Sequence, residues 1–246
     1  MTSAHARPFP WWLSPLLVVV VLGGFGLYSL WVTLAGFQDS SGQDLFRFGP
    51  YHSPFYSPFI EADWWPLSPA ILILWAPLGF RATCYYYRKA YYRAFFWDPP
   101  ACTIAERRGA RYSGETRFPF ILQNLHRFFL YLAIIVWLIL AYETIRAFIF
   151  NGQFGIGVGS LIFLINIISL GFYTFSCHSF RHLIGGRLDC FSCSAAARVR
   201  HKAWEGISAI NKNHMLWAWL SLFSVALTDL YVRLLVWGVL RDFRFF

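Results

Sequence analysis

The sequence predicts an all-α integral membrane protein with five transmembrane helices, and three observations support this prediction. First, 57% of the 246 residues are hydrophobic and only 13% are charged, whereas soluble domains carry about 25% charged residues. Second, five apolar stretches are long enough to cross about 30 Å of hydrocarbon, which takes about 20 helical residues. Third, these stretches lack the period-two alternation of membrane strands. A chain this apolar cannot cover a water-facing surface.

The predicted spans belong to one domain over residues 1–246, and they run approximately over residues 13–33, 65–83, 118–142, 155–177 and 214–236. The first span is longer than the apolar region of a signal peptide, and no small-residue cleavage site follows it, so we expect it to be retained. The second span contains Pro66, Pro69 and Pro77. The first two prolines suit a helix start, and Pro77 is expected to kink the helix.

Basic residues are concentrated in two loops, and this distribution predicts the orientation. One group follows the second span and the other follows the fourth: Arg81, Arg88, Lys89, Arg93, Arg107, Arg108, Arg111 and Arg117, then Arg181, Arg187, Arg198, Arg200, Lys202 and Lys212. Such loops face the cytoplasm. We therefore expect a multi-pass protein of the cell membrane with a cytoplasmic N-terminus. In this interpretation, the basic residues behind the formal charge of +9 set the orientation of the chain in the membrane. Nucleic acid is therefore not expected as a partner.

Cysteine and histidine residues gather at the predicted cytoplasmic ends of the spans. Cys84 follows the second span, His126 begins the third, Cys177 and His178 end the fourth, and His214 begins the fifth. Antiparallel helices would bring these side chains to one level at the inner edge of the bilayer. Two cysteines and two histidines are the ligands of a Rieske-type [2Fe–2S] centre, and thiolates suit its soft core.

Three other interpretations of these residues stay open. The local series Cys177, His178, His182, Cys190 and Cys193 could itself hold zinc or a [2Fe–2S] centre. Two histidines from different helices could instead hold a haem b, or the thiols and histidines could be unligated. A disulfide framework is not expected, because the count of five cysteines is odd and all of them fall on the reducing side.

An aromatic and cationic segment leaves the bilayer after the second span. Tyr87, Arg88 and Tyr91 are expected on a continuation of that helix, with Trp97 after it. This surface could be a membrane-interface belt, a docking face for a soluble subunit, or a wall of a quinone pocket, since a quinone needs apolar walls and donors for its carbonyls. Gln123, a polar residue within the third span, is added to this quinone region.

Several motifs together resemble one family of membrane proteins. These motifs are Cys84–Arg93, Pro99–Cys102, Gly114–Pro119, Gln123–Arg127 and Cys177–His182. They resemble the membrane-anchor subunit of succinate dehydrogenase, respiratory complex II, of the haem-free type with five helices. The resemblance covers most of the chain, from the second span to the fifth.

The resemblance implies a function that composition does not. A flavoprotein subunit would oxidise succinate, an iron–sulfur subunit would pass the electrons on, and this chain would deliver them through a Rieske-type [2Fe–2S] centre to menaquinone or ubiquinone. Within the resemblance, Cys84 and Cys177 are favoured as thiolate ligands. The two imidazoles would come from His126, His178, His182 and His214. The rival hypotheses are a b-type cytochrome subunit of another membrane dehydrogenase and a metal-free membrane scaffold or transport protein.

Overall fold

The computed structural model describes residues 10, 12–60, 64–95, 116, 118 and 120–246. Predictions that concern Trp97, Cys102 and most of Gly114–Pro119 lie outside the described residues.

Helices dominate the described chain, as predicted. Their bounds are α1 Leu13–Leu34, α2 Ile71–Thr83, α3 Tyr85–Phe95, α4 His126–Arg146, α5 Val158–Phe175, α6 His178–Gly185, α7 Ala195–Asn211 and α8 His214–Val236. Among the described residues, two 3₁₀ helices add one turn, η1 Pro54–Tyr56, and two turns, η3 Phe120–Leu125. Two antiparallel hairpins form from β1 Arg47–Phe48 with β2 Tyr51–His52, and from β3 Ile149–Phe150 with β4 Gln153–Phe154.

Four helices in the described part of the chain are long and apolar enough to cross a membrane: Leu13–Leu34, Ile121–Arg146, Val158–Phe175 and His214–Val236. They correspond to the first, third, fourth and fifth predicted spans. The second predicted span differs, because its helix begins only at Ile71 and has 13 residues. Pro66 and Pro69 precede this helix instead of opening it, and Pro77 lies inside it. The proline-rich segment before this helix is therefore not helical, and the helix is shorter than a full span requires.

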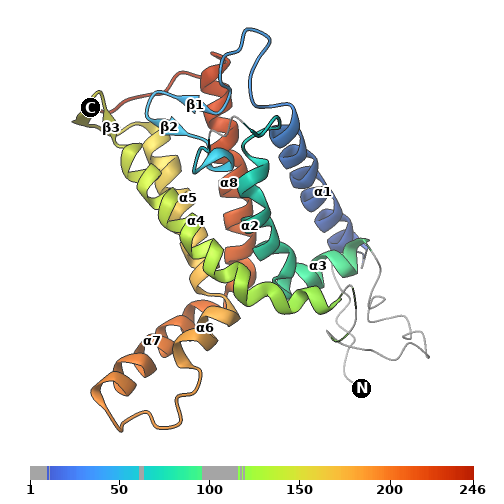
Figure 1. Ribbon diagram of the computed structural model, residues 1–246, viewed down its shortest axis with the longest axis vertical. Coiled ribbons are helices and arrows are strands. Elements are labelled where there is room, and N and C mark those ends of the chain that lie inside the picture. The colour runs from blue at the N-terminus through green and yellow to red at the C-terminus, as the bar shows by residue number, and fades with distance from the viewer. Residues whose placement is uncertain (1–9, 11, 61–63, 96–115, 117, 119) are drawn as a thin grey trace.

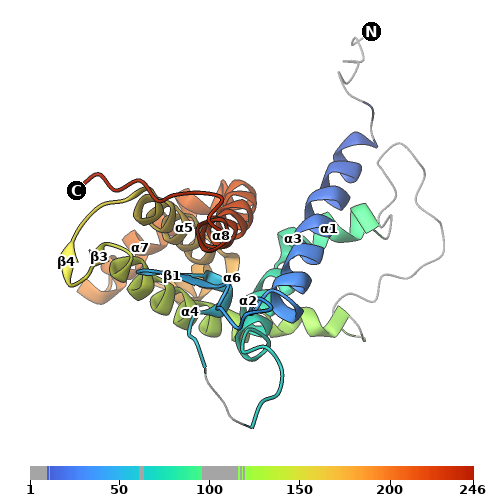
Figure 2. The ribbon, with the colours of Figure 1, turned by 90° about the horizontal axis from the view of Figure 1, so that it is seen from above.

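The main helices form an antiparallel bundle in which α5 packs along α8, and α4 packs against both α2 and α5 (Figure 1). The start of α1, the end of α2, and the starts of α4 and α8 share one end of this bundle with α6 and α7. The hairpins and the C-terminus lie at the other end. Seen from above, α1 stands beside the bundle and contacts α3 (Figure 2). This up-and-down order agrees with the alternation expected from the loops, whereas the membrane side of each end remains a prediction.

The segment after α2 does not continue that helix, which corrects the expectation of one long helix into the aromatic segment. Cys84 has an extended backbone (φ −63°, ψ 129°) and separates α2 from α3. The chain turns sideways at this residue, so that α3 crosses below α2 toward α1 (Figure 1). The break leaves the Cys84 side chain buried between the helices.

The opposite end of the bundle is closed by the segment after α1, which packs on α8. Asp229 and Arg233 of α8 are fully buried there and form an ion pair with Nε and Oδ2 2.8 Å apart. The two residues are four positions apart and so lie on the same face of α8. Tyr28 of α1 and Ser53 before η1 both donate hydrogen bonds to Asp229, and Arg233 donates one to the Gly36 carbonyl at 2.6 Å. One buried carboxylate thus joins three segments that are distant in the sequence.

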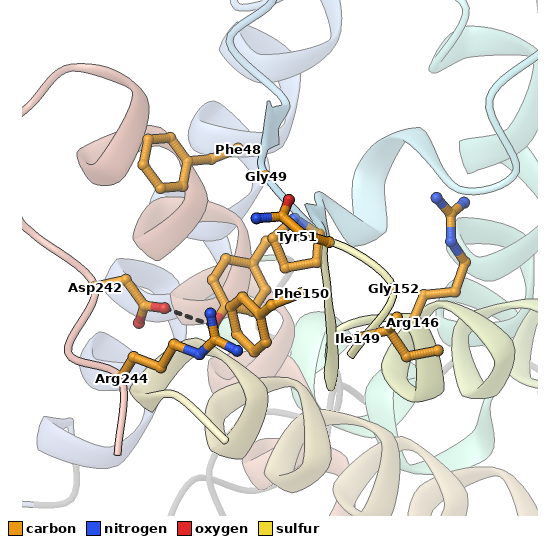
Figure 3. A pocket seen from close by; sticks show the side chains of 11 residues that line it. Phe48, Gly49, Tyr51, Arg146, Ile149, Phe150, Gly152, Asp242 and Arg244 are labelled. Atoms are coloured by element: carbon orange, nitrogen blue, oxygen red, sulfur yellow. Dashed lines mark hydrogen bonds between the residues drawn. The ribbon is translucent and has the colours of Figure 1, made fainter. Parts of the chain in front are cut away.

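A polar cavity of about 590 Å³ lies among the two hairpins and the C-terminal tail (Figure 3). Arg146, Arg244 and Asp242 line it together with aromatic residues. Tyr51 donates a hydrogen bond of 2.6 Å to Asp242 and so fixes the tail against β2. This cavity is at the end of the bundle away from the cysteines.

Candidate functional site

Two cysteines and two histidines from four separate helix boundaries meet at one end of the bundle. Cys84 ends α2 and Cys177 precedes α6, while His126 and His214 are the first residues of α4 and α8. Both cysteines are buried and carry free thiols. His126 Nε2 lies 3.0 Å from Cys177 Sγ, and His214 Nε2 lies 3.5 Å from Cys84 Sγ. The structure therefore places these four side chains in two thiol–imidazole pairs.

A hydroxyl group fixes the tautomer of His126. Its Nδ1 lies 2.9 Å from Thr83 Oγ1, and the Thr83 hydroxyl donates its proton to the Gly79 carbonyl at 2.7 Å. A hydroxyl has a single proton to donate, so Thr83 must accept from His126 Nδ1–H. The Nε2 atom then carries no proton, and its lone pair faces the Cys177 thiol. This is the form of imidazole that can ligate a metal.

His214 is held in the same way from the other side. Its Nδ1 lies 2.7 Å from Ser176 Oγ, which is also 3.4 Å from the Tyr173 carbonyl oxygen. The partners are crossed: Thr83 precedes Cys84 but holds the histidine that faces Cys177. Ser176 precedes Cys177 but holds the histidine that faces Cys84. Hydrogen bonds of this kind set the orientation of ligating histidines in metal sites.

Aromatic rings cover the two imidazoles. Phe80 stacks on His126 with ring centroids 4.7 Å apart and planes 6° apart, and Tyr173 stacks on His214 at 5.3 Å and 18°. Phe80, Tyr173 and both cysteines belong to one buried cluster that also contains Leu130. The two cysteines are thus held in a densely packed, buried cluster, while His126 and His214 are partly exposed and each is covered by one aromatic ring.

The arrangement is not that of a mononuclear metal site. Among the described residues, no group of three or more His, Cys, Asp or Glu side chains is placed to hold one metal ion. Two thiols and two imidazoles are the ligand types of a Rieske-type centre, in which both cysteines bind one iron and both histidines bind the other. The contacting pairs here are mixed, one thiol with one imidazole.

Comparison with known proteins shows the family to which the chain belongs. The family model described as actinobacterial succinate dehydrogenase subunit SdhC matches residues 13–238. The chain belongs to this family. It is therefore a membrane-anchor subunit of a succinate dehydrogenase, an oxidoreductase complex, and the family predicted from the motifs is confirmed at this level.

A solved structure supports the assignment of the SdhC-family chain. A chain of the Mycobacterium smegmatis Sdh1 complex in the apo form is 39% identical, with a TM-score of 0.83, over 100% of this chain and 96% of that chain. No curated protein sequence matches the chain.

The other predicted histidines of this SdhC-family chain do not join the buried cluster. His178 and His182 lie on α6 and are exposed. His182 Nδ1 is 3.4 Å from the Arg127 guanidinium on the outside of α4. Of the six residues predicted as possible metal ligands, the structure therefore brings together Cys84, Cys177, His126 and His214.

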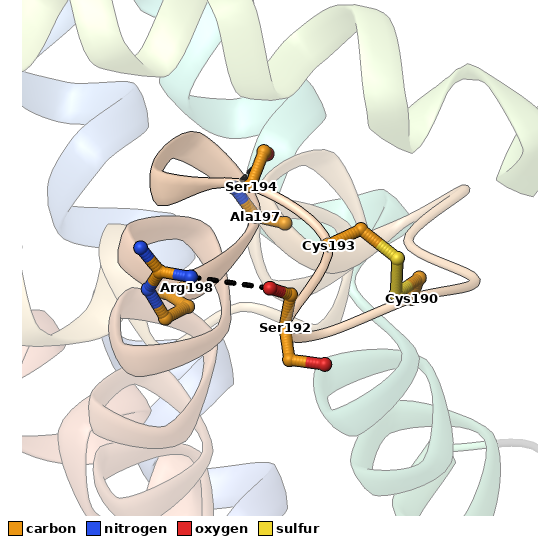
Figure 4. Close-up of a disulfide and its surroundings, with 6 residues drawn as sticks. All are labelled: Cys190, Ser192, Cys193, Ser194, Ala197 and Arg198. Carbon is orange, nitrogen blue, oxygen red and sulfur yellow. Dashed lines mark hydrogen bonds between the residues drawn. A yellow bond between two sulfur atoms is a disulfide. The ribbon is translucent and has the colours of Figure 1, made fainter.

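Cys190 and Cys193 form a disulfide (Figure 4), so the expectation of no disulfide is wrong for this pair. The local cluster proposed over residues 177–193 is wrong for the same reason, since these sulfurs bond each other. The loop is further tied by Arg198, which donates to the Ser192 carbonyl at 3.1 Å, and by Ser194, which caps α7. The three-residue spacing that suggested metal binding serves instead to close a tight turn.

The residues predicted for a quinone region are divided between two environments. Tyr87 is buried, donates to the Ala218 carbonyl at 2.6 Å and accepts from Arg81 at 2.5 Å. Tyr91 accepts from Gln123 Nε2 at 3.1 Å at the surface between α3 and η3. The Arg88 guanidinium lies 5.0 Å from the Tyr85 ring, and Trp97 lies outside the described residues.

Sequence reasoning missed the hydroxyl partners and the residues that cover the histidines. A usable signal was present, because each buried cysteine directly follows a hydroxyl residue, in Thr83-Cys84 and Ser176-Cys177. The role of Tyr173 has no comparable signal, since an aromatic residue near a helix end is typical of a membrane interface.

Proposed function

We propose that this SdhC-family chain relays electrons from an iron–sulfur subunit of succinate dehydrogenase to a quinone through a Rieske-type [2Fe–2S] centre. Cys84 and Cys177 would supply the thiolates, and His126 and His214 the imidazoles. The centre would supply one-electron transfer. The iron–sulfur subunit and a flavoprotein subunit are the proposed partners, and menaquinone or ubiquinone is the proposed acceptor.

The meeting of four donors at one level carries this proposal. Each comes from a different helix boundary, and both histidines have Nε2 toward a thiol and Nδ1 against a hydroxyl, that of Thr83 or of Ser176. Unligated histidines at helix ends have no reason to share this arrangement. Burial of the two thiols also favours a bound centre. Unligated thiols would not require two oriented imidazoles beside them.

The chain's own residues would orient the centre and keep it dry. The hydroxyls of Thr83 and Ser176 fix the two imidazole planes, and Phe80 and Tyr173 cover them. Asn211 at the end of α7 donates to the Ser176 carbonyl at 2.6 Å, which ties the basic α6–α7 hairpin to the site. We propose that this end faces the cytoplasm, where the iron–sulfur subunit would dock beside the basic residues of α7.

The test compares ligand variants with variants of the exposed histidines in the purified complex. Cys177→Ala and His126→Ala should abolish a Rieske-like EPR signal and quinone reduction, while succinate is still oxidised with a soluble dye as acceptor. His178→Ala and His182→Ala are the matched controls and should retain the signal. A full signal in Cys177→Ala would refute the ligand assignment. Sharp haem bands, or the absence of iron and acid-labile sulfide, would reject the centre itself.

A further inference from the structure

The disulfide between Cys190 and Cys193 lies in the loop between α6 and α7, away from the main bundle (Figures 1 and 4). Cys193 is exposed, as is its neighbour Ser192, and Cys190 is partly buried. This end of the molecule is the one proposed to face the cytoplasm, where disulfides are rare and those that form are usually transient, catalytic or redox-sensing. An accessible disulfide on that side therefore points to chemistry at the pair.

Contacts other than the disulfide already hold this loop in place. Arg200 of α7 donates hydrogen bonds to the carbonyls of Ile184 at 3.0 Å and Gly186 at 2.9 Å. The Phe191 ring packs on α7, with its centroid 4.4 Å from that of the His201 ring. The two cysteines are only three positions apart, and closing so short a loop removes less chain entropy than closing a long one. A purely structural role therefore explains the pair poorly.

The surroundings of Cys193 favour a reactive thiolate more than those of Cys190 do. Figure 4 shows the Arg198 guanidinium directed at the carbonyl of Ser192, 3.1 Å away and immediately before Cys193. Helix α7 begins two residues after Cys193, so the positive end of its dipole adjoins this loop. Thiolates form most readily beside such positive groups, whereas Cys190 directly follows the carboxylate of Asp189. Cys193 is therefore the sulfur expected to react first.

We propose that Cys190 and Cys193 form a reversible thiol–disulfide site that exchanges with a dithiol reductant of the cytoplasm. A thiolate of the reductant attacks the exposed Cys193 Sγ, and Cys190 leaves as a thiolate that takes up a proton. The second thiol of the reductant then attacks its own sulfur in the mixed disulfide and releases Cys193. The reductant becomes a disulfide, and two electrons and two protons pass to the pair. This inference rests on the proposed orientation of the chain and is independent of the iron–sulfur centre.

Reduction and reoxidation of the purified complex test whether the pair is reversible. The complex is reduced with dithiothreitol and reoxidised with glutathione disulfide, without denaturant. Acid quenching, maleimide blocking and mass spectrometry of the peptide that carries both cysteines give the reduced fraction. The pair should become fully reduced and then fully oxidised again. A pair that stays oxidised in excess dithiothreitol, or stays reduced in excess glutathione disulfide, would overturn the proposal.

Single-cysteine variants test which sulfur reacts first. Cys190→Ser leaves Cys193 without a partner, so glutathione disulfide should convert it to a mixed disulfide. Cys193→Ser leaves the partly buried Cys190, which should react at least about fivefold more slowly. Equal or reversed rates would overturn the mechanism proposed for the pair.

The charge of Arg198 is tested in the Cys190→Ser background. Arg198→Gln keeps a donor for the Ser192 carbonyl and removes the cation, so the mixed disulfide should form about threefold more slowly. Lys202→Gln, which removes an exposed cation one turn further along α7, is the matched control and should react at the unchanged rate. An unchanged rate in Arg198→Gln would refute the electrostatic basis of the proposal.

A membrane-impermeant maleimide tests the side on which the pair lies. After reduction, the peptide with both cysteines should be labelled in inverted vesicles and unlabelled in sealed right-side-out vesicles. Label from the outside alone would overturn the proposal together with the proposed orientation, because no cytoplasmic dithiol could reach the pair. The EPR signal separates these failures from failure of the electron relay. An intact signal with a pair that does not exchange rejects this inference alone, and an exchanging pair without any cluster signal rejects the relay alone.

Discussion

The buried ion pair of α8 gives the sharpest test of how this fold is held together. Asp229 and Arg233 have no exposed side-chain surface, and their charged groups are 2.8 Å apart. Replacing Asp229 with asparagine keeps the size of the side chain and one acceptor oxygen, but it turns the second acceptor, used by Tyr28 or Ser53, into an NH2 donor. It also removes the negative charge, so the Arg233 guanidinium is left as an uncompensated buried cation.

The expected loss in the free energy of unfolding follows from leaving the buried Arg233 charge without its partner. Removing one partner of a buried ion pair costs about 3–5 kcal/mol, because the remaining charge keeps its desolvation penalty. Arg233 then keeps the Gly36 carbonyl, to which it donates, and the Trp31 ring, 5.2 Å from its guanidinium carbon. We expect Asp229→Asn to lose about 3 kcal/mol or more in the free energy of unfolding, measured by thermal or denaturant unfolding of the complex in detergent.

Two controls make this result interpretable. Glu143→Gln breaks the pair with Arg146, which is 4.0 Å long with the Arg146 side chain 56% exposed, and should change stability by less than about 1 kcal/mol. The double variant Asp229→Leu with Arg233→Met removes both charges and should be more stable than Asp229→Asn. Stability of Asp229→Asn within 1 kcal/mol of the unmodified chain, by the same estimate, would refute the reasoning.

The remaining predictions concern the site, the closing segment and one close approach. Thr83→Val removes the acceptor of His126 Nδ1–H and should lower cluster occupancy by about 10- to 100-fold, measured as iron and EPR intensity, with Thr83→Ser restoring both. Burial, reinforced by nearby arginines, lowers the pKa of His52 from 6.5 to about 4. The unfolded chain therefore binds the extra proton first, and stability should fall by up to about 3 kcal/mol as the pH drops from 6.5 to 4. His52→Gln should flatten this slope in unfolding curves. A Cβ at Gly159 would lie 2.4 Å from the Tyr51 ring, so Gly159→Ala should cost about 1–3 kcal/mol. Gly206→Ala, with nothing within 4 Å of the new Cβ, should not destabilise α7.

Hydropathy could predict the bundle, because lipid imposes long apolar helices on any chain that crosses it. It could not predict where α2 begins, since Pro66 and Pro69 suit a helix start as well as the irregular approach that the structure has. The turn at Cys84 could not be predicted from the sequence either. The residues after it have good helix periodicity, and only the packing of α3 against α1 decides that the chain leaves the axis of α2.

The level of the cysteines and histidines could be predicted because it depends only on topology. Each candidate ligand adjoins the end of a helix, and antiparallel helices bring such ends together. Selection among six candidates needed the side-chain contacts. His178 directly follows Cys177, yet its side chain is exposed on α6, while His126 and His214 are turned inward by hydroxyls from other segments.

The crossed hydroxyl contacts suggest why the site can stay formed in so apolar a bundle. Each cysteine is joined in the chain to the hydroxyl that holds the histidine facing the other cysteine. Displacing α2 would move Cys84 and the orientation of His126 together, and displacing the end of α5 would do the same to Cys177 and His214. A single movement therefore disturbs both halves. Ser176→Ala should therefore disturb the environment of Cys84 as well as that of His214. An EPR spectrum that changes while the thiolate ligation of Cys84 stays the same would contradict this coupling.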